Sequence, residues 1–88
     1  MDSYQTVLEN LAKQGYIKIR THAGDEDLKG CLRGVIGGGE REAVYEEEAE
    51  GLVRVFFVKE EGIREDDPVA IVYTEKAYEK ETAPPPGA

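Results

Sequence analysis

LVRVFFV at residues 52–58 and VAIVY at residues 69–73 are two segments that are apolar on both faces of a strand. A strand with one solvated face alternates apolar and polar residues, because successive side chains point in opposite directions. These segments do not alternate, so both of their faces must be covered. In a chain of 88 residues the cover comes from the N-terminal helix or from another copy of the protein. We therefore expect a small β domain that self-associates, with an interface formed by Val53, Val55, Phe57, Ala70 and Val72.

The bulk composition indicates one domain near the lower size limit for a self-sufficient apolar core. The single cysteine, Cys31, excludes an internal disulfide framework and suits a reducing compartment. No apolar run approaches the length of about 20 residues that a membrane span needs, and no secretory signal follows Met1. We therefore expect a cytoplasmic protein without membrane partners. The net charge is −8, and all of it arises from residues 34–88, since the basic and acidic groups of residues 1–33 balance.

The pattern along the chain predicts a mainly β (α+β) fold. Residues 3–14 have the apolar spacing of an amphipathic helix, and residues 16–22 alternate as a strand with one wet face. Further strands are expected at 28–36, 42–48, 51–59 and 69–75, with a polar turn at residues 23–27 and a second turn at Gly37-Gly38-Gly39. Two glycines in the 28–36 segment favour strong bending. The sequence thus predicts a helix and a strongly bent five-stranded antiparallel barrel over residues 1–77, followed by a flexible charged and Pro-rich tail over 78–88.

Two stretches carry a resemblance to a known family. VLENLAKQ at residues 7–14, followed by Ile17-Lys18-Ile19, and LKGCLRG at residues 28–34 resemble the helix and the bent second strand of the Sm-like/Hfq-like small β-barrel family. The resemblance implies an SH3/Sm-like barrel, assembly of copies into a ring, and binding of RNA. Glu46 and Glu47 stand where Hfq-like members carry cations, which implies loss of their uridine contact.

The candidate binding surface is the outward face of the first two predicted strands. Cations beside a stacking ring are what single-stranded nucleic acid requires. The residues predicted to converge there are Tyr16, Lys18, Arg20, His22, Lys29 and Arg33. We therefore expect a non-enzymatic interaction module that self-associates and binds RNA or a protein partner.

Two alternatives remain open. The clustered carboxylates of Glu46–Glu50 and Glu60–Asp67 suit an acidic inhibitor or adaptor that mimics nucleic acid and binds a basic protein. Residues 51–77 also resemble half of a lipoyl or biotinyl carrier domain, which would make Lys76 the modified lysine. No catalytic, cofactor or metal signature is found: His22 and Cys31 are too few for a metal site, and Cys31 has no identifiable base.

Overall fold

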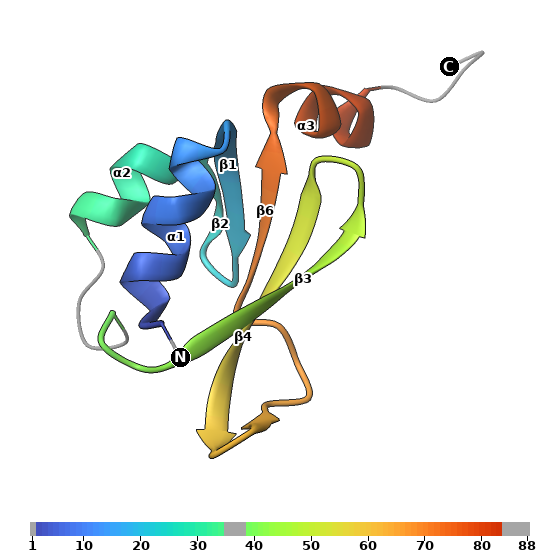
Figure 1. Ribbon diagram of the computed structural model, residues 1–88. Coiled ribbons are helices and arrows are strands. Elements are labelled where there is room, and N and C mark those ends of the chain that lie inside the picture. The colour runs from blue at the N-terminus through green and yellow to red at the C-terminus, as the bar shows by residue number, and fades with distance from the viewer. Residues whose placement is uncertain (1, 35–38, 84–88) are drawn as a thin grey trace.

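Three helices and six strands form the part of the chain that the structure describes (Figure 1). The structure is a computed structural model and describes residues 2–34 and 39–83. In chain order the elements are α1 (Tyr4–Lys13), β1 (Tyr16–Thr21), β2 (Gly24–Asp27), α2 (Leu28–Arg33), β3 (Ala43–Ala49), β4 (Leu52–Glu60), β5 (Ile63–Arg64), β6 (Ala70–Thr74) and α3 (Glu75–Thr82). Within the described residues no helix is both long enough and apolar enough to cross a membrane.

The helix α1 forms where the sequence predicts it. Ser3 caps its N-terminus, and the Ser3 hydroxyl accepts a hydrogen bond from the Thr6 amide at 3.1 Å. The helix ends before Gly15, which has a φ of 99°, a conformation that glycine adopts without strain. Its apolar stripe is buried and consists of Tyr4, Val7, Leu8 and Leu11.

The strands form one antiparallel sheet in the order β2-β1-β6-β4-β3, with β5 added to the far end of β4. We call the face that carries α1 and α2 the inner face and the opposite face the outer face. The sheet is open, because β2 and β3 are at its two ends, so the structure confirms an antiparallel β-rich fold with an N-terminal helix but not a closed barrel. The predicted strands at 16–22, 42–48, 51–59 and 69–75 are confirmed as β1, β3, β4 and β6, while the predicted turn at 23–27 contains β2.

The predicted bent strand at 28–36 is wrong, because residues 28–33 form the helix α2. Leu28 is fully buried, and Cys31 and Leu32 are packed against the core, a spacing of three and four residues that belongs to a helix. Residues 35 and 36 and most of the predicted Gly37–Gly39 turn lie outside the described residues.

The inner face of the sheet is covered by α1 and α2 from the same chain. Val53, Val55, Ala70 and Val72 are at most 3 % exposed and belong to the same core cluster as the buried side chains of α1. Phe57 is partly buried against the same core, and its ring meets the Tyr4 ring edge-on at 5.0 Å. The residues predicted as the interface between copies therefore form the core of one chain. Self-association stays a prediction, but the need to cover these side chains no longer supports it.

The outer face is covered by side chains rather than by a helical layer. The Arg64 guanidinium lies 3.9 Å from the centroid of the buried Phe56 ring. The buried Tyr73 ring lies beneath the Tyr78 ring of α3, with 5.8 Å between centroids. The folded chain therefore continues beyond residue 77, and the prediction of a flexible tail is wrong for residues 78–82, whereas residues 84–88 lie outside the described residues.

Candidate interaction surface

Lys18 and Arg20 lie on the outer face of β1, as predicted, but each is held by a carboxylate of β2. Lys18 faces Asp27 across the hairpin, with the Lys18 Nζ 2.6 Å from the Asp27 Oδ1. Arg20 faces Asp25, with its Nε 2.7 Å from the Asp25 Oδ1, and its Nη1 lies 3.8 Å from Glu81. The hydrogen bond from Arg20 lowers the pKa of Asp25. These cations are neutralised within the chain before any polyanion approaches.

Tyr16 does not share the face of these cations. A register shift between Tyr16 and Lys18 places Tyr16 against the core of the inner face. Burial raises the pKa of Tyr16, and the nearby Glu47 and Tyr45 raise it further. The ring beside the β1 cations is instead Tyr78, whose hydroxyl donates to Asp25 at 3.1 Å and whose ring centroid is 5.4 Å from the Lys18 Nζ. The sequence contains a signal for the helix that carries this ring, because Thr74 followed by Glu75 is a typical helix start.

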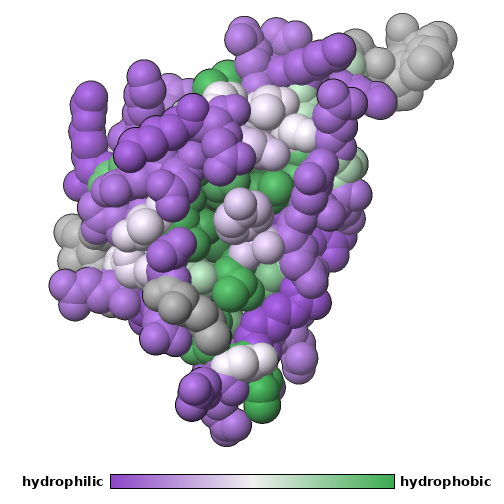
Figure 2. Space-filling view, in the orientation of Figure 1, coloured by the Kyte–Doolittle hydropathy of each residue, from purple (hydrophilic) through white to green (hydrophobic). Residues whose placement is uncertain are grey.

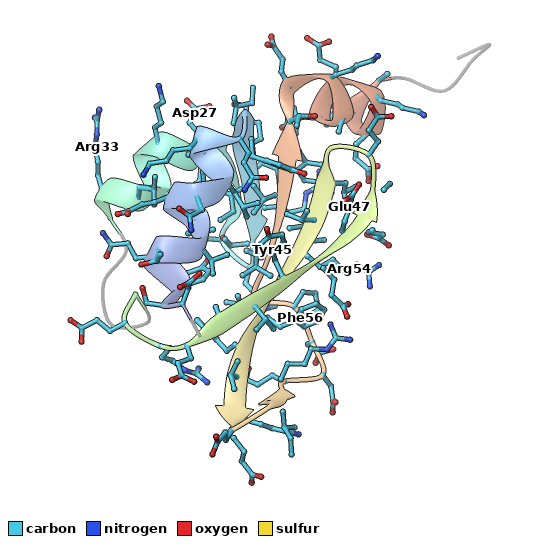
Figure 3. The ribbon with its side chains drawn as sticks, viewed as in Figure 1. Asp27, Arg33, Tyr45, Glu47, Arg54 and Phe56 are labelled. Atoms are coloured by element: carbon cyan, nitrogen blue, oxygen red, sulfur yellow. The ribbon has the colours of Figure 1, made fainter. Side chains whose placement is uncertain are left out.

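The other predicted cations are dispersed. His22 is exposed beyond the end of β1, beside a shallow hollow of about 370 Å³ that Asp67 and Pro68 also line. Lys29 and Arg33 are exposed on α2, on the inner side of the sheet. Figure 3 shows Arg33 and Arg54 projecting on opposite sides of the molecule. The predicted convergence of Tyr16, Lys18, Arg20, His22, Lys29 and Arg33 is therefore wrong.

Three more arginines are paired with glutamates in the same way. Arg54 of β4 makes a two-pronged ion pair with Glu48 of β3, Arg64 pairs with Glu46, and the Arg41 Nη2 lies 2.8 Å from the Glu65 Oε1. Arg41 also stacks on Phe57 at 4.0 Å from the ring centroid. Four of the five arginines in the chain thus have an internal carboxylate partner.

Carboxylates remain in excess after this pairing, and several gather where β3 turns into β4. Glu47 and Glu50 line a hollow of about 710 Å³ between this turn and α3, together with Tyr16, Lys76 and Lys80. Lys76 lies in the first turn of α3 rather than at a hairpin tip, so the setting predicted for a carrier lysine is absent. Figure 2 shows hydrophilic residues along the margin formed by β3 and the turn, with apolar residues in a band between β3 and α1.

Cys31 is a thiol rather than a thiolate at neutral pH. Burial raises its pKa to about 11, and a hydrogen bond to Glu26 and the Glu26 charge add to the effect. A nucleophilic or metal-binding cysteine acts as the thiolate. Across residues 2–34 and 39–83, no group of three or more histidine, cysteine, aspartate or glutamate side chains is placed to hold a metal ion.

This environment predicts slow alkylation of Cys31. At pH 7.5 iodoacetamide is expected to modify it about 100-fold more slowly than an unperturbed thiol, with a rate that rises with pH as the thiolate forms. Glu26→Gln removes the charge that disfavours the thiolate and is expected to accelerate the reaction, measured by intact mass. An unchanged rate in Glu26→Gln would contradict the assigned role of Glu26, and the urea-unfolded chain provides the unperturbed reference.

Known proteins do not identify this surface. Comparison with protein-family models, with curated proteins and with solved structures gives no match for this chain. The result neither confirms nor contradicts the Sm-like resemblance, although residues 28–33, which carried part of it, form a helix.

Proposed function

We propose that this protein is a non-enzymatic acidic adaptor that binds a basic segment of another protein. The observation that carries the proposal is the internal neutralisation of its arginines. Arg20, Arg41, Arg54 and Arg64 all face carboxylates of the same chain, so an RNA phosphate would have to displace an existing partner from each.

The carboxylates are not matched in this way. Glu47 and Glu50 are exposed at the end of β3 and in the turn after it, and neither forms an ion pair within the described residues. With a net charge of −8, the field around the molecule attracts basic partners and repels nucleic acid. Of the two acidic segments that the sequence indicates, the proposal places the contact at Glu46–Glu50, because residues 46–49 lie on a strand with an open edge and Glu50 follows directly in the turn.

The adaptor is expected to bind a labelled basic peptide of about twelve residues in which lysine and threonine alternate. Fluorescence anisotropy would show binding that weakens from about 50 to 200 mM salt, because partly exposed charges are screened. The Glu47→Gln/Glu50→Gln double variant is expected to weaken binding about tenfold, since each rim charge contributes modestly.

The matched control is Glu75→Gln/Glu79→Gln on α3, which changes the net charge by the same amount at exposed positions that neither lie on β3 nor line the hollow beside Glu47 and Glu50. It is expected to bind the peptide nearly as tightly as the unaltered protein. A single-stranded uridine RNA of the same length is expected not to bind. Binding of that RNA without binding of the peptide would overturn the proposal in favour of the RNA-binding hypothesis.

A further inference from the structure

We propose that the open edge of β3 over residues 45–49 is the contact itself, and that it binds an extended basic segment of the partner as an additional strand. The inference rests on the proposed function and specifies its geometry. β3 is the last strand of the sheet, and no described strand lies beyond it over these residues. Such an edge presents backbone donors and acceptors that an incoming strand can pair.

The direction of each backbone group on β3 follows from two hydrogen bonds at its beginning. The Val58 amide of β4 donates to the Glu42 carbonyl at 3.0 Å, so residue 42 faces β4. The Ala43 amide donates to the Asp2 carbonyl at 2.9 Å, so residue 43 faces the open edge. These directions alternate along an antiparallel strand, and the register with β4 stays regular as far as Glu47. The amides and carbonyls of Tyr45 and Glu47 therefore face the open edge.

Extended backbone of the same chain already pairs with the beginning of this edge. The Tyr4 amide donates to the Arg41 carbonyl at 2.7 Å, and Ser3 forms an antiparallel bridge with Glu42. This contact shows that the edge accepts extended backbone. The described part of it ends at the Asp2 carbonyl, so the partner segment is placed alongside residues 45–49.

Charge decides what kind of strand fits. Of the three consecutive glutamates on the edge strand, Glu46 and Glu48 hold Arg64 and Arg54. Glu47, and Glu50 in the turn that follows, form no ion pair within the described residues. A second copy pairing β3 with β3 would set glutamates opposite glutamates, which destabilises a strand pair. A basic segment would instead set positive side chains opposite the glutamates, so the interaction between the paired side chains becomes attractive. The opposite edge, β2, is less suitable, because Asp25 and Asp27 already hold Arg20 and Lys18.

The inner side of the edge specifies the partner further. Tyr45 and Glu47 lie opposite Val55 and Val53 of β4 and so belong to the inner face, yet Tyr45 is 44 % exposed. Figure 3 shows Tyr45 on the α1 side of β3 and Arg54 and Phe56 on the other side. Strand side chains two apart share a face, so the bound segment would place one lysine beside Tyr45, where its aliphatic stem covers the ring, and the next lysine of that face beside Glu47.

The test compares Glu47→Pro with Glu47→Thr, using the same labelled lysine–threonine peptide. Both variants remove the carboxylate, but only proline removes the outward amide, and an edge strand tolerates proline where the amide faces solvent. Glu47→Pro is expected to bind about tenfold more weakly than Glu47→Thr, since a donor is lost and the ring obstructs the incoming strand. Circular dichroism verifies that both variants are folded.

Hydrogen exchange of the unaltered protein provides a second readout that does not depend on the variants. The peptide is expected to slow exchange of the Tyr45 and Glu47 amides at least about tenfold, while those of Val44 and Glu46, which already face β4, change little. Peptide binding with equal affinities for the two variants, or without this alternating protection, would overturn strand addition and leave the acidic adaptor standing. Absence of peptide binding altogether would overturn both proposals.

Discussion

Leu8→Ala is expected to lower the free energy of unfolding by about 2–5 kcal/mol, the range for truncating a buried leucine. Leu8 is completely buried at the centre of the α1 stripe, where it belongs to the core cluster that includes Val53 and Val72. The removed methyl groups leave a cavity between the helix and the sheet. Because a domain of this size has a total stability of roughly 5 kcal/mol or slightly more, much of the variant would be unfolded at 37 °C.

Urea denaturation followed by circular dichroism measures this loss, and Gln5→Ala on the exposed side of α1 is the matched control. The control is expected to change stability by less than about 0.5 kcal/mol. The unfolding midpoint of the unaltered protein is expected not to depend on its concentration, since α1 of the same chain covers the sheet. A midpoint that rises with concentration, together with a small effect of Leu8→Ala, would mean that another subunit supplies the cover.

The sequence predicts correctly the elements with an unambiguous period and the two strands that are apolar on both faces, β4 and β6. Residues 4–13 repeat at 3.6 residues and form α1, and residues 16–21 alternate and form β1. Residues 28–33 are ambiguous in a specific way. Leu28 and Leu32 are four apart, and that spacing places two side chains on one face of a helix and on one face of a strand alike. Only Cys31, three residues after Leu28, distinguishes the two, and the predicted strand left it on the other face.

The candidate surface was less predictable because it depends on partners distant in sequence. Lys18 and Arg20 were correctly assigned to one face of a strand, but a cation is available to a ligand only if no carboxylate faces it. The register of the β1–β2 hairpin places Asp27 and Asp25 opposite these cations. It depends on β2, whose residues were predicted to form a turn. The Arg54–Glu48 pair could have been predicted from the sequence, because a tight turn joins the two predicted strands and brings residues 48 and 54 close together.

Gly51→Ala is expected to destabilise the protein more than Gly62→Ala, although both glycines have a φ of 76°. Alanine pays the same left-handed backbone strain at each position, about 1 kcal/mol. At Gly62 a Cβ would meet open space, whereas at Gly51 it would overlap the Thr74 Oγ1 and lie 3.2 Å from the Ala77 Cβ. Overpacking of this kind adds about 1–3 kcal/mol, so we expect a total loss near 3 kcal/mol for Gly51→Ala.

The difference in stability between Gly51→Ala and Gly62→Ala measures how closely the β3–β4 turn packs against α3. This contact forms the wall of the hollow beside Glu47 and Glu50. The Thr74 amide also donates to the Gly51 carbonyl at 2.9 Å, so the turn and the start of α3 cannot separate without breaking this bond. A double-mutant cycle with Thr74→Ala is expected to be non-additive, because the second change removes the atom that the new methyl group overlaps. Equal urea-unfolding losses for Gly51→Ala and Gly62→Ala would contradict this close approach and, with it, the placement of α3 against the acidic turn.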